Sequence, residues 1–324
     1  MKSSTEILQA VNTYLDQLPY DRQPRSLYEP IQYVLSLGGK RIRPVLMLLV
    51  YNMYKDDPES ILPSACALET YHNYTLLHDD LMDNADLRRG HPTVHRRWDA
   101  NTAILSGDSM LVLAYERMAQ CRPDKLAAVM ALFTETALEI GEGQQYDMDF
   151  ETRDDVSIPE YMEMIRLKTA VLLAAALKIG ALAACAPDDD IQNLYQFGIN
   201  IGLAFQLRDD LLDAYGDIAT FGKQTGTDIK DNKKTFLYLQ ALEKADPSQR
   251  QLLTSLFKKQ PDNPQQKINQ VIDTYNTLNI RKDVEERIAQ LHSQAATCLD
   301  SIHRPDEAKE VLRQMAAKLL DRNV

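Results

Sequence analysis

The sequence is poor in the residues that build disulfide-bonded, zinc-binding or β-rich proteins. Its 324 residues include 12 glycines, one tryptophan and four cysteines. The cysteines occur singly and show no CxxC or Cys/His spacing, so neither a zinc motif nor a disulfide framework is indicated; they are Cys66, Cys121, Cys185 and Cys298. Scattered single cysteines suit a reducing compartment, and we expect a cytoplasmic protein.

Basic charge and long apolar runs are also scarce. The chain has 36 Lys and Arg residues but 47 Asp and Glu residues, which gives a formal net charge of −11. This excludes a broad surface for nucleic acid, so any anionic ligand must be bound locally. The most apolar run, 170–186, contains Lys178, stops at Pro187 and is shorter than the about 20 residues that span a bilayer. The N-terminal segment lacks the apolar stretch of a secretory signal, and we expect no stable membrane insertion.

Helical periodicity is abundant. Hydrophobic residues make up 44% of the chain and recur every three or four positions, whereas alternating strand patterns are nearly absent. No linker separates two domains, so we predict one all-α domain over 1–324, a large antiparallel helical bundle around a deep central cavity. The predicted helices are 5–18, 27–37, 44–55, 60–84, 99–119, 124–147, 158–186, 189–215, 233–245, 247–259, 264–278, 282–301 and 305–321.

One carboxylate motif, DDxxD, occurs twice, in LHDDLMD and in FQLRDDLLD. At 100° per residue, its first and last aspartates lie about 40° apart on one helix face. A like-charged pair about 4 Å apart costs roughly 4 kcal/mol at an effective dielectric constant of 20, so burying such a pair calls for a cation. A single copy would fit a solvated acidic face, but two copies predict Mg²⁺ shared with a phosphorylated substrate. The predicted metal ligands are Asp79, Asp80, Asp83, Asp209, Asp210 and Asp213.

Basic residues cluster at two places in this acidic chain. GGKRIRP supplies Lys40, Arg41 and Arg43, and DLRRG supplies Arg88 and Arg89 directly after the first aspartate motif. Arginine binds phosphate oxygens bidentately, and lysine supplies a compact point charge. We interpret both clusters as local anion sites. The alternatives are a helix end followed by solvated cations for GGKRIRP, and ion pairs with neighbouring aspartates for the two arginines.

Taken in order, eight segments resemble the polyprenyl synthetase family of trans-isoprenyl diphosphate synthases: GGKRIRP, HNYTLLHDDLMD, DLRRGHPT, GQQYD, KTA, FQLRDDLLD, GKQTGTD and KKT. They span residues 38–235. The resemblance implies the all-α isoprenoid synthase fold and a homodimer. It also implies prenyl transfer from dimethylallyl, geranyl or farnesyl diphosphate to isopentenyl diphosphate. KTA stands where many members have KTG, which removes a glycine but none of the implied contacts.

The resemblance further implies roles for individual residues. The aspartate motifs would hold Mg²⁺, three ions per active site with substrate bound, against the allylic diphosphate. The residues that would contact that diphosphate are Arg88, Lys168, Lys223 and Lys233. The diphosphate of isopentenyl diphosphate would be bound by Gly39, Lys40, Arg43, His72 and Arg89. Thr169 and Gln206 match positions that face the reacting carbons and the developing cation.

The position of His72 can be checked without the family. It lies seven residues before Asp79, and seven residues are within about 20° of two full helical turns, so His72 shares the aspartate face. A lone histidine is more often a structural residue. Its place beside the aspartates and the family resemblance favour a binding role here.

The implied chemistry is ionisation, condensation and proton elimination. Mg²⁺ offsets the charge that grows on a departing diphosphate, so the allylic C–O bond can break heterolytically in a closed site. The isopentenyl double bond then attacks the allylic cation, and the released diphosphate takes the proton that is lost. The Gln206 amide, the Thr169 hydroxyl oxygen and carbonyl dipoles would stabilise the positive charge.

Product length is expected to depend on the helix before the first motif. Tyr74 lies five residues before Asp79, about 7.5 Å back along the axis, and its ring is the predicted floor of the product pocket beside the smaller Thr75. This pattern, without an insertion in DDxxD, resembles some geranylgeranyl diphosphate synthases. On this pattern we predict geranylgeranyl diphosphate. Farnesyl diphosphate follows closely, because Met110 and Leu113 could close the pocket earlier. A longer polyprenyl diphosphate is the alternative.

Three other functions fit the sequence less well. A phosphohydrolase built on His78 and Asp79 would leave the second aspartate motif unexplained. A terpene cyclase shares metal-triggered ionisation but normally has a differently composed second motif. A non-catalytic synthase subunit would usually have lost aspartates or basic residues. In a homodimer, the apolar helix 101–119 is a candidate interface, although its residues could equally belong to the core.

Overall fold

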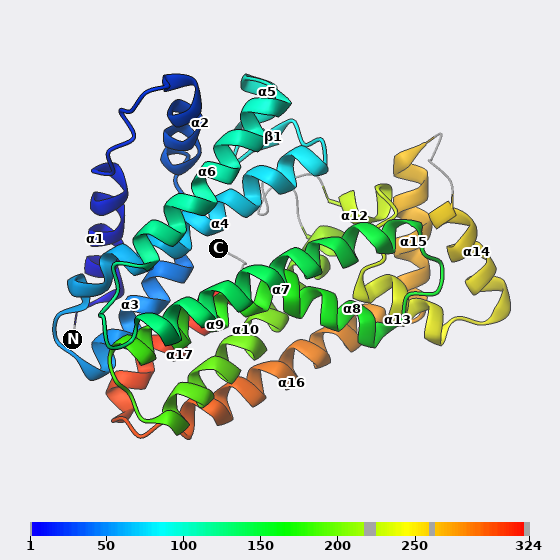
Figure 1. Ribbon diagram of the computed structural model, residues 1–324. Helices are drawn as coiled ribbons and strands as arrows, with labels where there is room; N and C mark the ends of the chain where they lie inside the picture. Colours follow the sequence, from blue (N-terminus) through cyan, green and yellow to red (C-terminus); the bar gives the residue numbers. More distant parts are fainter. Residues whose placement is uncertain (1, 217–224, 259–262, 321–324) are drawn as a thin grey trace. The chain divides into compact units, whose positions relative to one another are not determined.

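A computed structural model describes residues 2–216, 225–258 and 263–320, and this part of the chain is helical almost throughout (Figure 1). Within it, the strands are β1 (Leu87–Arg88) and β2 (His91–Pro92), which pair antiparallel. The prediction of an all-α fold is confirmed. No helix among the described residues is long and apolar enough to cross a membrane.

The helices, in chain order, agree closely with the predicted ones. They are α1 (Ser4–Asp16), α2 (Arg25–Ser36), α3 (Ile42–Tyr54), α4 (Leu62–Met82), α5 (Val94–Arg97), α6 (Ala100–Met118), α7 (Leu126–Thr152), α8 (Ile158–Ile165), α9 (Val171–Ala183), α10 (Asp188–Tyr215), α12 (Thr227–Lys230), α13 (Phe236–Lys244), α14 (Pro247–Lys258), α15 (Pro264–Thr277), α16 (Ile280–Asp300) and α17 (Asp306–Leu320). A 3₁₀ turn, η1 (Pro58–Ile61), precedes α4, and a π-helical turn, η2 (Arg166–Ala170), joins α8 to α9. The single predicted helix 158–186 is therefore interrupted.

The chain forms two compact units, which we describe separately. The first comprises Met1–Thr134, Ala175–Ile191 and Arg304–Val311, and the second comprises Glu135–Ala174, Gln192–His303 and Leu312–Val324. The single domain over 1–324 and the cavity at its centre stay predictions.

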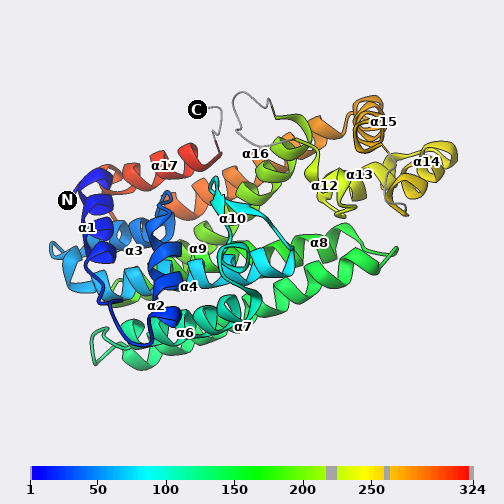
Figure 2. The same ribbon diagram turned by 90° about the horizontal axis from the view of Figure 1, so that it is seen from above.

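Helix α4 organises the first unit and lies beside α6 (Figures 1 and 2). Gly107 of α6 makes this approach possible, because a Cβ atom there would collide with the His78 imidazole. Leu77 of α4 packs in a hydrophobic cluster with Met110 and Leu113 of α6. The packing fixes the rotation of α4 and thus the direction of the aspartates at its C-terminal end.

Local capping determines where helices α8 and α10 begin. Ser157 and Glu160 form a reciprocal capping box at the start of α8, in which the Ser157 hydroxyl accepts a hydrogen bond from the Glu160 backbone N–H. The run Asp188, Asp189 and Asp190 supplies negative charge to the first turn of α10. Both starts agree with the sequence to within one residue of the predicted 158 and 189.

Candidate active site

The first aspartate motif lies at the C-terminal end of α4. Asp79 and Asp80 are in its last turn, and the exposed Asp83 is the C-cap residue. Asp80 is only 5% exposed, and its two carboxylate oxygens accept hydrogen bonds from Arg88 Nε at 2.9 and 3.1 Å. Burial raises the pKa of Asp80 in spite of this guanidinium. The Arg88 guanidinium also lies 3.7 Å from Asp79 Oδ2, so it sits against two of the three predicted ligands.

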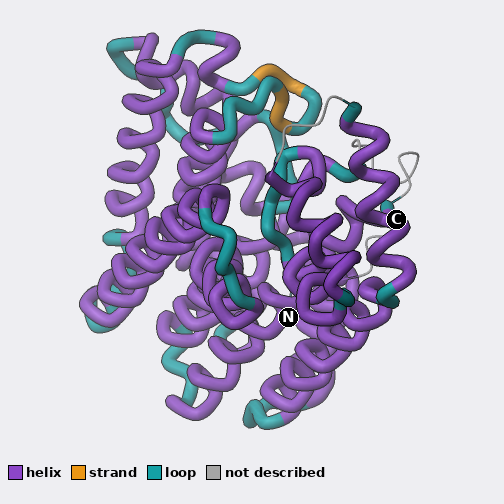
Figure 3. The backbone as a smooth tube through the Cα atoms, turned by 90° about the vertical axis from the view of Figure 1, so that its right-hand side faces the viewer, coloured by secondary structure: helices purple, strands orange, loops and turns teal. Residues whose placement is uncertain are grey.

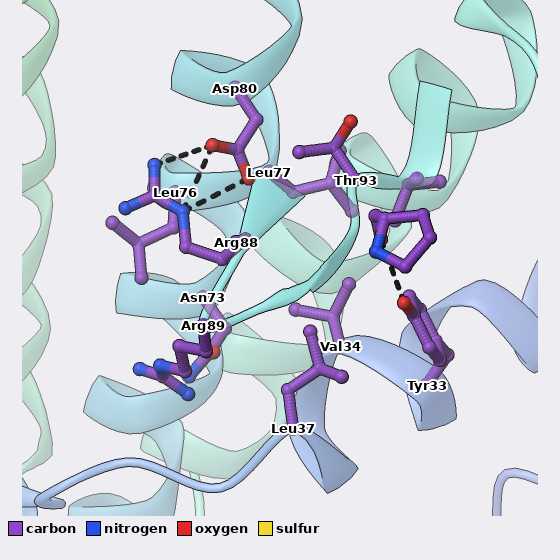
Figure 4. A pocket seen from close by; sticks show the side chains of 12 residues that line it. Tyr33, Val34, Leu37, Asn73, Leu76, Leu77, Asp80, Arg88, Arg89 and Thr93 are labelled. Atoms are coloured by element: carbon purple, nitrogen blue, oxygen red, sulfur yellow. Dashed lines mark hydrogen bonds and ion pairs between the residues drawn. The ribbon is translucent and has the colours of Figure 1, made fainter. Parts of the chain in front are cut away.

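The hairpin β1–β2 (Figure 3) carries two consecutive arginines, which have different partners. Arg89 and Gly90 have φ values of 54° and 78°, the left-handed pair that a tight two-residue hairpin turn requires. Arg88 turns toward Asp80 on α4, and Arg89 points away from it (Figure 4). A pocket lined in part by Leu37, Leu76 and both arginines lies between α2, α4 and the hairpin.

Cationic groups gather around His72. The Arg89 guanidinium donates to the Gly38 carbonyl and would collide with a Cβ atom at Gly39. Burial, followed by the neighbouring Arg43 and Arg89, lowers the pKa of His72 well below its usual value, so the imidazole is neutral. Burial also lowers the pKa of Arg43 to about 10, and its buried Nε has no hydrogen-bond partner among the described residues. A buried unpaired donor beside other cations has the properties of an anion site.

Arg41 departs from the sequence interpretation. It is 5% exposed and donates to Glu69 Oε1 at 2.7 Å and to the Leu35 carbonyl at 2.6 Å. Our interpretation of Arg41 as an anion-binding residue was wrong, because a buried carboxylate on α4 already pairs with it. Arg41 instead fastens the GGK loop, including the exposed Lys40, to α4.

The second aspartate motif lies inside α10, where a chain of hydrogen bonds meets Asp210. The Thr169 hydroxyl donates to Gln206 Oε1 at 3.1 Å, and Gln206 Nε2 donates to Asp210 Oδ1 at 3.1 Å. The Tyr161 hydroxyl donates to the other Asp210 oxygen. Burial raises the pKa of Asp210 to about 7. The structure thus brings together Thr169 and Gln206, which the sequence could only assign separately.

The N-terminus of the short helix α12 binds the last aspartate of this motif. Asp213 accepts hydrogen bonds from the backbone N–H groups of Thr227 and Asp228, at 3.2 and 3.0 Å. Burial, with Asp213 and Asp210 adding to it, raises the pKa of Asp228 well above its usual value. The sequence predicted no role for Asp228, although this residue ends the family-like segment GKQTGTD.

Asp147 on α7 forms ion pairs with Lys168 and Lys233, two of the three lysines predicted to bind the allylic diphosphate. Its Oδ2 lies 2.8 Å from Lys168 Nζ and 3.5 Å from Lys233 Nζ, and Lys233 also contacts Glu151 at 2.7 Å. Burial raises the pKa of Asp147, but the two lysines outweigh it and the net pKa is lowered. The sequence predicted no role for Asp147 either. The signal that could have identified it is its position at the end of the family-like segment GQQYD. The third predicted lysine, Lys223, lies outside the described residues.

Lys168 and Thr169 lie in the π-turn, where the Val171 N–H donates to the Arg166 carbonyl five residues earlier. Two glycines make room for this wide turn. A Cβ atom at Gly143 of α7 would collide with the backbone of Lys168, and one at Gly202 of α10 would lie 2.5 Å from Ala170 Cα. The turn is therefore held by close backbone contact with α7 and α10.

Tyr74 is half-buried on the face of α4 that meets α6. Its ring centroid lies 5.5 Å from that of Tyr71 and 4.8 Å from that of His78, and the ring packs against the cluster that contains Met110. The Thr75 hydroxyl donates back to the His72 carbonyl at 2.8 Å. The role of Tyr74 as a pocket floor stays a prediction.

His78 points to α6. Its Nε2 lies 3.4 Å from the Ile104 carbonyl oxygen and 4.0 Å from Asp108. Among the described residues, no three His, Cys, Asp or Glu side chains gather as a ready metal site. The contacts of His78 with α6 disfavour the phosphohydrolase, which needs His78 and further ligands on one metal ion.

Comparison with known proteins identifies the family. A family model described as polyprenyl synthetase matches residues 24–275. The chain belongs to the polyprenyl synthetase family. The geranylgeranyl diphosphate synthase of Methanosarcina mazei is 41% identical over 236 residues, which are 72% of this chain and 73% of that protein. The short chain isoprenyl diphosphate synthase of Methanocaldococcus jannaschii is 40% identical over 253 residues, 78% and 75% of the two chains.

The solved structures agree. A crystal structure of a geranylgeranyl pyrophosphate synthase superposes with a TM-score of 0.93, is 40% identical and covers 99% of both chains. This polyprenyl synthetase is therefore a prenyl transferase, and the resemblance inferred from its motifs is confirmed. The roles of its individual site residues stay predictions.

Proposed function

We propose that this polyprenyl synthetase condenses isopentenyl diphosphate with an allylic diphosphate and releases a short-chain product, geranylgeranyl diphosphate ahead of farnesyl diphosphate. The supporting observation is that the chain carries two separately built cationic sets. One surrounds His72 in the first unit, and the other is the Lys168–Lys233 pair on Asp147 in the second. Two anion sites suit a reaction that joins two diphosphate substrates.

The donor set fits Mg²⁺. Near α12, the Asp213 carboxylate adds to the raised pKa of Asp210, and both carboxylates add to the raised pKa of Asp228, a repulsion that a divalent ion would relieve. All of these donors are oxygens, the ligands that Mg²⁺ prefers. We expect the two aspartate motifs to hold three ions with substrate bound. When bound, Mg²⁺ offsets the negative charge that grows on the leaving diphosphate.

The chain's own residues bind and orient the two substrates. We expect Arg88, held by Asp80, to bind the allylic diphosphate, and we expect the same of the lysines held by Asp147. Arg43 and Arg89, with Lys40, would bind the diphosphate of isopentenyl diphosphate beside the neutral His72. The Thr169 hydroxyl donates to Gln206 Oε1 and so orients the amide, whose oxygen keeps a second lone pair for a developing positive charge. The proton lost after condensation would pass to an oxygen of the released diphosphate.

A homodimer is part of the proposal. Helix α6 buries one face in the hydrophobic cluster, yet Leu105 is 60% and Val112 67% exposed on its other side. Large apolar side chains on one exposed helix face favour a protein interface. We expect Leu105→Asp with Val112→Asp to give a monomer in analytical ultracentrifugation, whereas Asp108→Asn should leave the dimer intact.

The decisive experiment is product analysis. The purified protein is incubated with Mg²⁺, labelled isopentenyl diphosphate and dimethylallyl, geranyl or farnesyl diphosphate, and the products are dephosphorylated and sized. We expect elongation that stops at the geranylgeranyl chain. A folded protein that elongates no primer would contradict the proposal and favour the cyclase or the non-catalytic subunit.

Tyr74 can be tested in the same assay. Tyr74→Ala should lengthen the product distribution, because it removes the ring that would block the growing chain. Tyr74→Phe keeps the ring and should keep the wild-type length. An unchanged distribution in Tyr74→Ala would show that the floor lies elsewhere.

A further inference from the structure

Lys267 on α15 is a buried cation that the proposed chemistry does not use. It is 3% exposed, and its ammonium group donates to the Lys230 carbonyl at 3.4 Å and to Asn232 Oδ1. The group also lies 5.0 Å from the centre of the Phe257 ring. Burying an ammonium group costs free energy unless hydrogen bonds replace its hydration. We therefore attribute the buried position of Lys267 to these contacts.

The partners of Lys267 form the turn that ends α12. Lys230 is the last residue of that helix, and Asn232 is left-handed with φ of 62°. The Lys233 N–H donates to the Asp228 carbonyl at 2.8 Å and the Asn232 N–H to the Ile229 carbonyl at 3.3 Å, which closes the helix end. Lys267 thus adds a side-chain clamp to a turn that the backbone has already formed.

This turn connects two groups of the second unit's site. On one side, α12 carries Asp228 and binds Asp213 with its N-terminal N–H groups. On the other side, Lys233 reaches Asp147 and Glu151. Helix α15 supports both ends of α12, since a Cβ atom at Gly226 would lie 2.9 Å from Ile268. The residue next to Ile268 is Lys267.

We propose that Lys267 is a positioning residue for the allylic diphosphate subsite: by clamping the turn after α12 it fixes Lys233, and with it Asp228, in their working positions. Lys267 itself touches no substrate. The inference rests on the proposed function, because Lys233 is expected to contact the allylic diphosphate. It predicts an effect that is confined to one of the two substrates.

The test uses Lys267→Met, which keeps the apolar stem, and Asn232→Gly, which removes the acceptor but suits the left-handed backbone. With isopentenyl diphosphate saturating, each variant should raise the KM for the allylic primer about tenfold, the loss expected for one charged hydrogen bond. The KM for isopentenyl diphosphate should stay unchanged. Because both changes break the contact between Lys267 and Asn232, the double variant should be no worse than Lys267→Met alone. Lys258→Met, which removes an exposed lysine paired with Asp154, is the matched control.

Equal changes in both KM values, or a lower melting temperature with unchanged kinetics, would overturn the inference and leave Lys267 a purely structural residue. Strictly additive effects would overturn it as well. If Lys267→Met fails to fold, Asn232→Gly carries the test alone.

The failure of the proposed function can be recognised separately. Wild-type elongation is measured first and judges that function by itself. Binding of a sulfur-bridged dimethylallyl diphosphate analogue with Mg²⁺, followed by calorimetry, then gives a readout that needs no turnover. We expect about tenfold weaker binding in both variants. Unchanged binding in both would overturn the role of Lys267.

Discussion

The two DDxxD motifs share a sequence pattern but hold their middle aspartate in different ways. Asp80 and Asp210 are each 5% exposed. Asp80 meets a guanidinium, that of Arg88, whereas Asp210 accepts hydrogen bonds from the neutral Tyr161 and Gln206. Burial raises the pKa of both carboxyls, but among the described residues only Asp80 has a cation against it. Spacing decides which carboxylates share a face, and residues from other segments decide their charge state.

The outer aspartates differ as well. Asp83 is an exposed C-cap at the end of α4, whereas Asp213 lies within α10 and accepts two N–H groups from α12. The first motif therefore ends at an exposed residue, whereas the last carboxylate of the second motif is hydrogen-bonded to another helix. We expect the motifs to respond differently to substitution, except at their first aspartates.

The largest effect should come from the first aspartates, where the motifs are expected to behave alike. Asp79→Asn and Asp209→Asn should each lower kcat about 10³-fold, because each removes a ligand from the ion that offsets leaving-group charge. Steady-state kinetics at saturating Mg²⁺ measure this, with the exposed Asp108→Asn as control. A tenfold difference between the two variants would show that one motif dominates the chemistry.

The partners of the middle aspartates should separate the motifs more clearly. Arg88→Met removes a proposed diphosphate contact and leaves Asp80 buried without its cation, so the KM for the allylic primer should rise about 100-fold. Tyr161→Phe removes one neutral hydrogen bond and should change that KM about threefold or less. Circular dichroism would verify the folding of both variants. Equal effects would mean that the charge of the partner is unimportant.

A different kind of effect, on stability, is expected in protein free of Mg²⁺. The pKa of Asp210 is raised to about 7, so between about pH 4 and pH 7 the folded state keeps a proton that the unfolded chain has released. The free energy of unfolding should therefore fall as pH rises through this window, by up to about 1.4 kcal/mol per pH unit from this group. Urea unfolding at several pH values should show a shallower slope in Asp210→Asn. Asp80→Asn, whose carboxyl faces a cation, should change the slope less, and the opposite order would contradict the comparison.

Much of this architecture follows from the sequence, because long helices repeat their apolar positions many times. Spacing alone predicts that His72 lies on the same face of its helix as Asp79, and spacing alone reveals the two DDxxD motifs. The four-residue helices α5 and α12 contain about one turn each and show no periodicity. The strands of the hairpin have two residues each, too few to alternate.

The roles of single charged residues were harder to predict. Arg41 and Arg43 are two positions apart in one motif, yet Arg41 pairs with the buried Glu69, whereas the Nε of Arg43 has no hydrogen-bond partner in the described part of the chain. Asp147 and Asp228 are ordinary acidic residues until Lys168 and Asp213 are brought beside them. Partners from distant segments determine such roles, and a single sequence does not record those contacts.

The π-turn has a consequence for insertions and deletions. It contains one residue more than a regular α-helix would need over the same path. Deleting one residue from 166–170 would leave a helix of nearly the same composition and propensity. The helical segments on the two sides would keep their mutual orientation, because a regular helix covers the same path, but residues within the turn would move by up to one position, about 100° around the axis. The alignment of Lys168 and Thr169 with Asp147 and Gln206 thus depends on chain length as well as on residue identity, a requirement that scanning by substitution would never reveal.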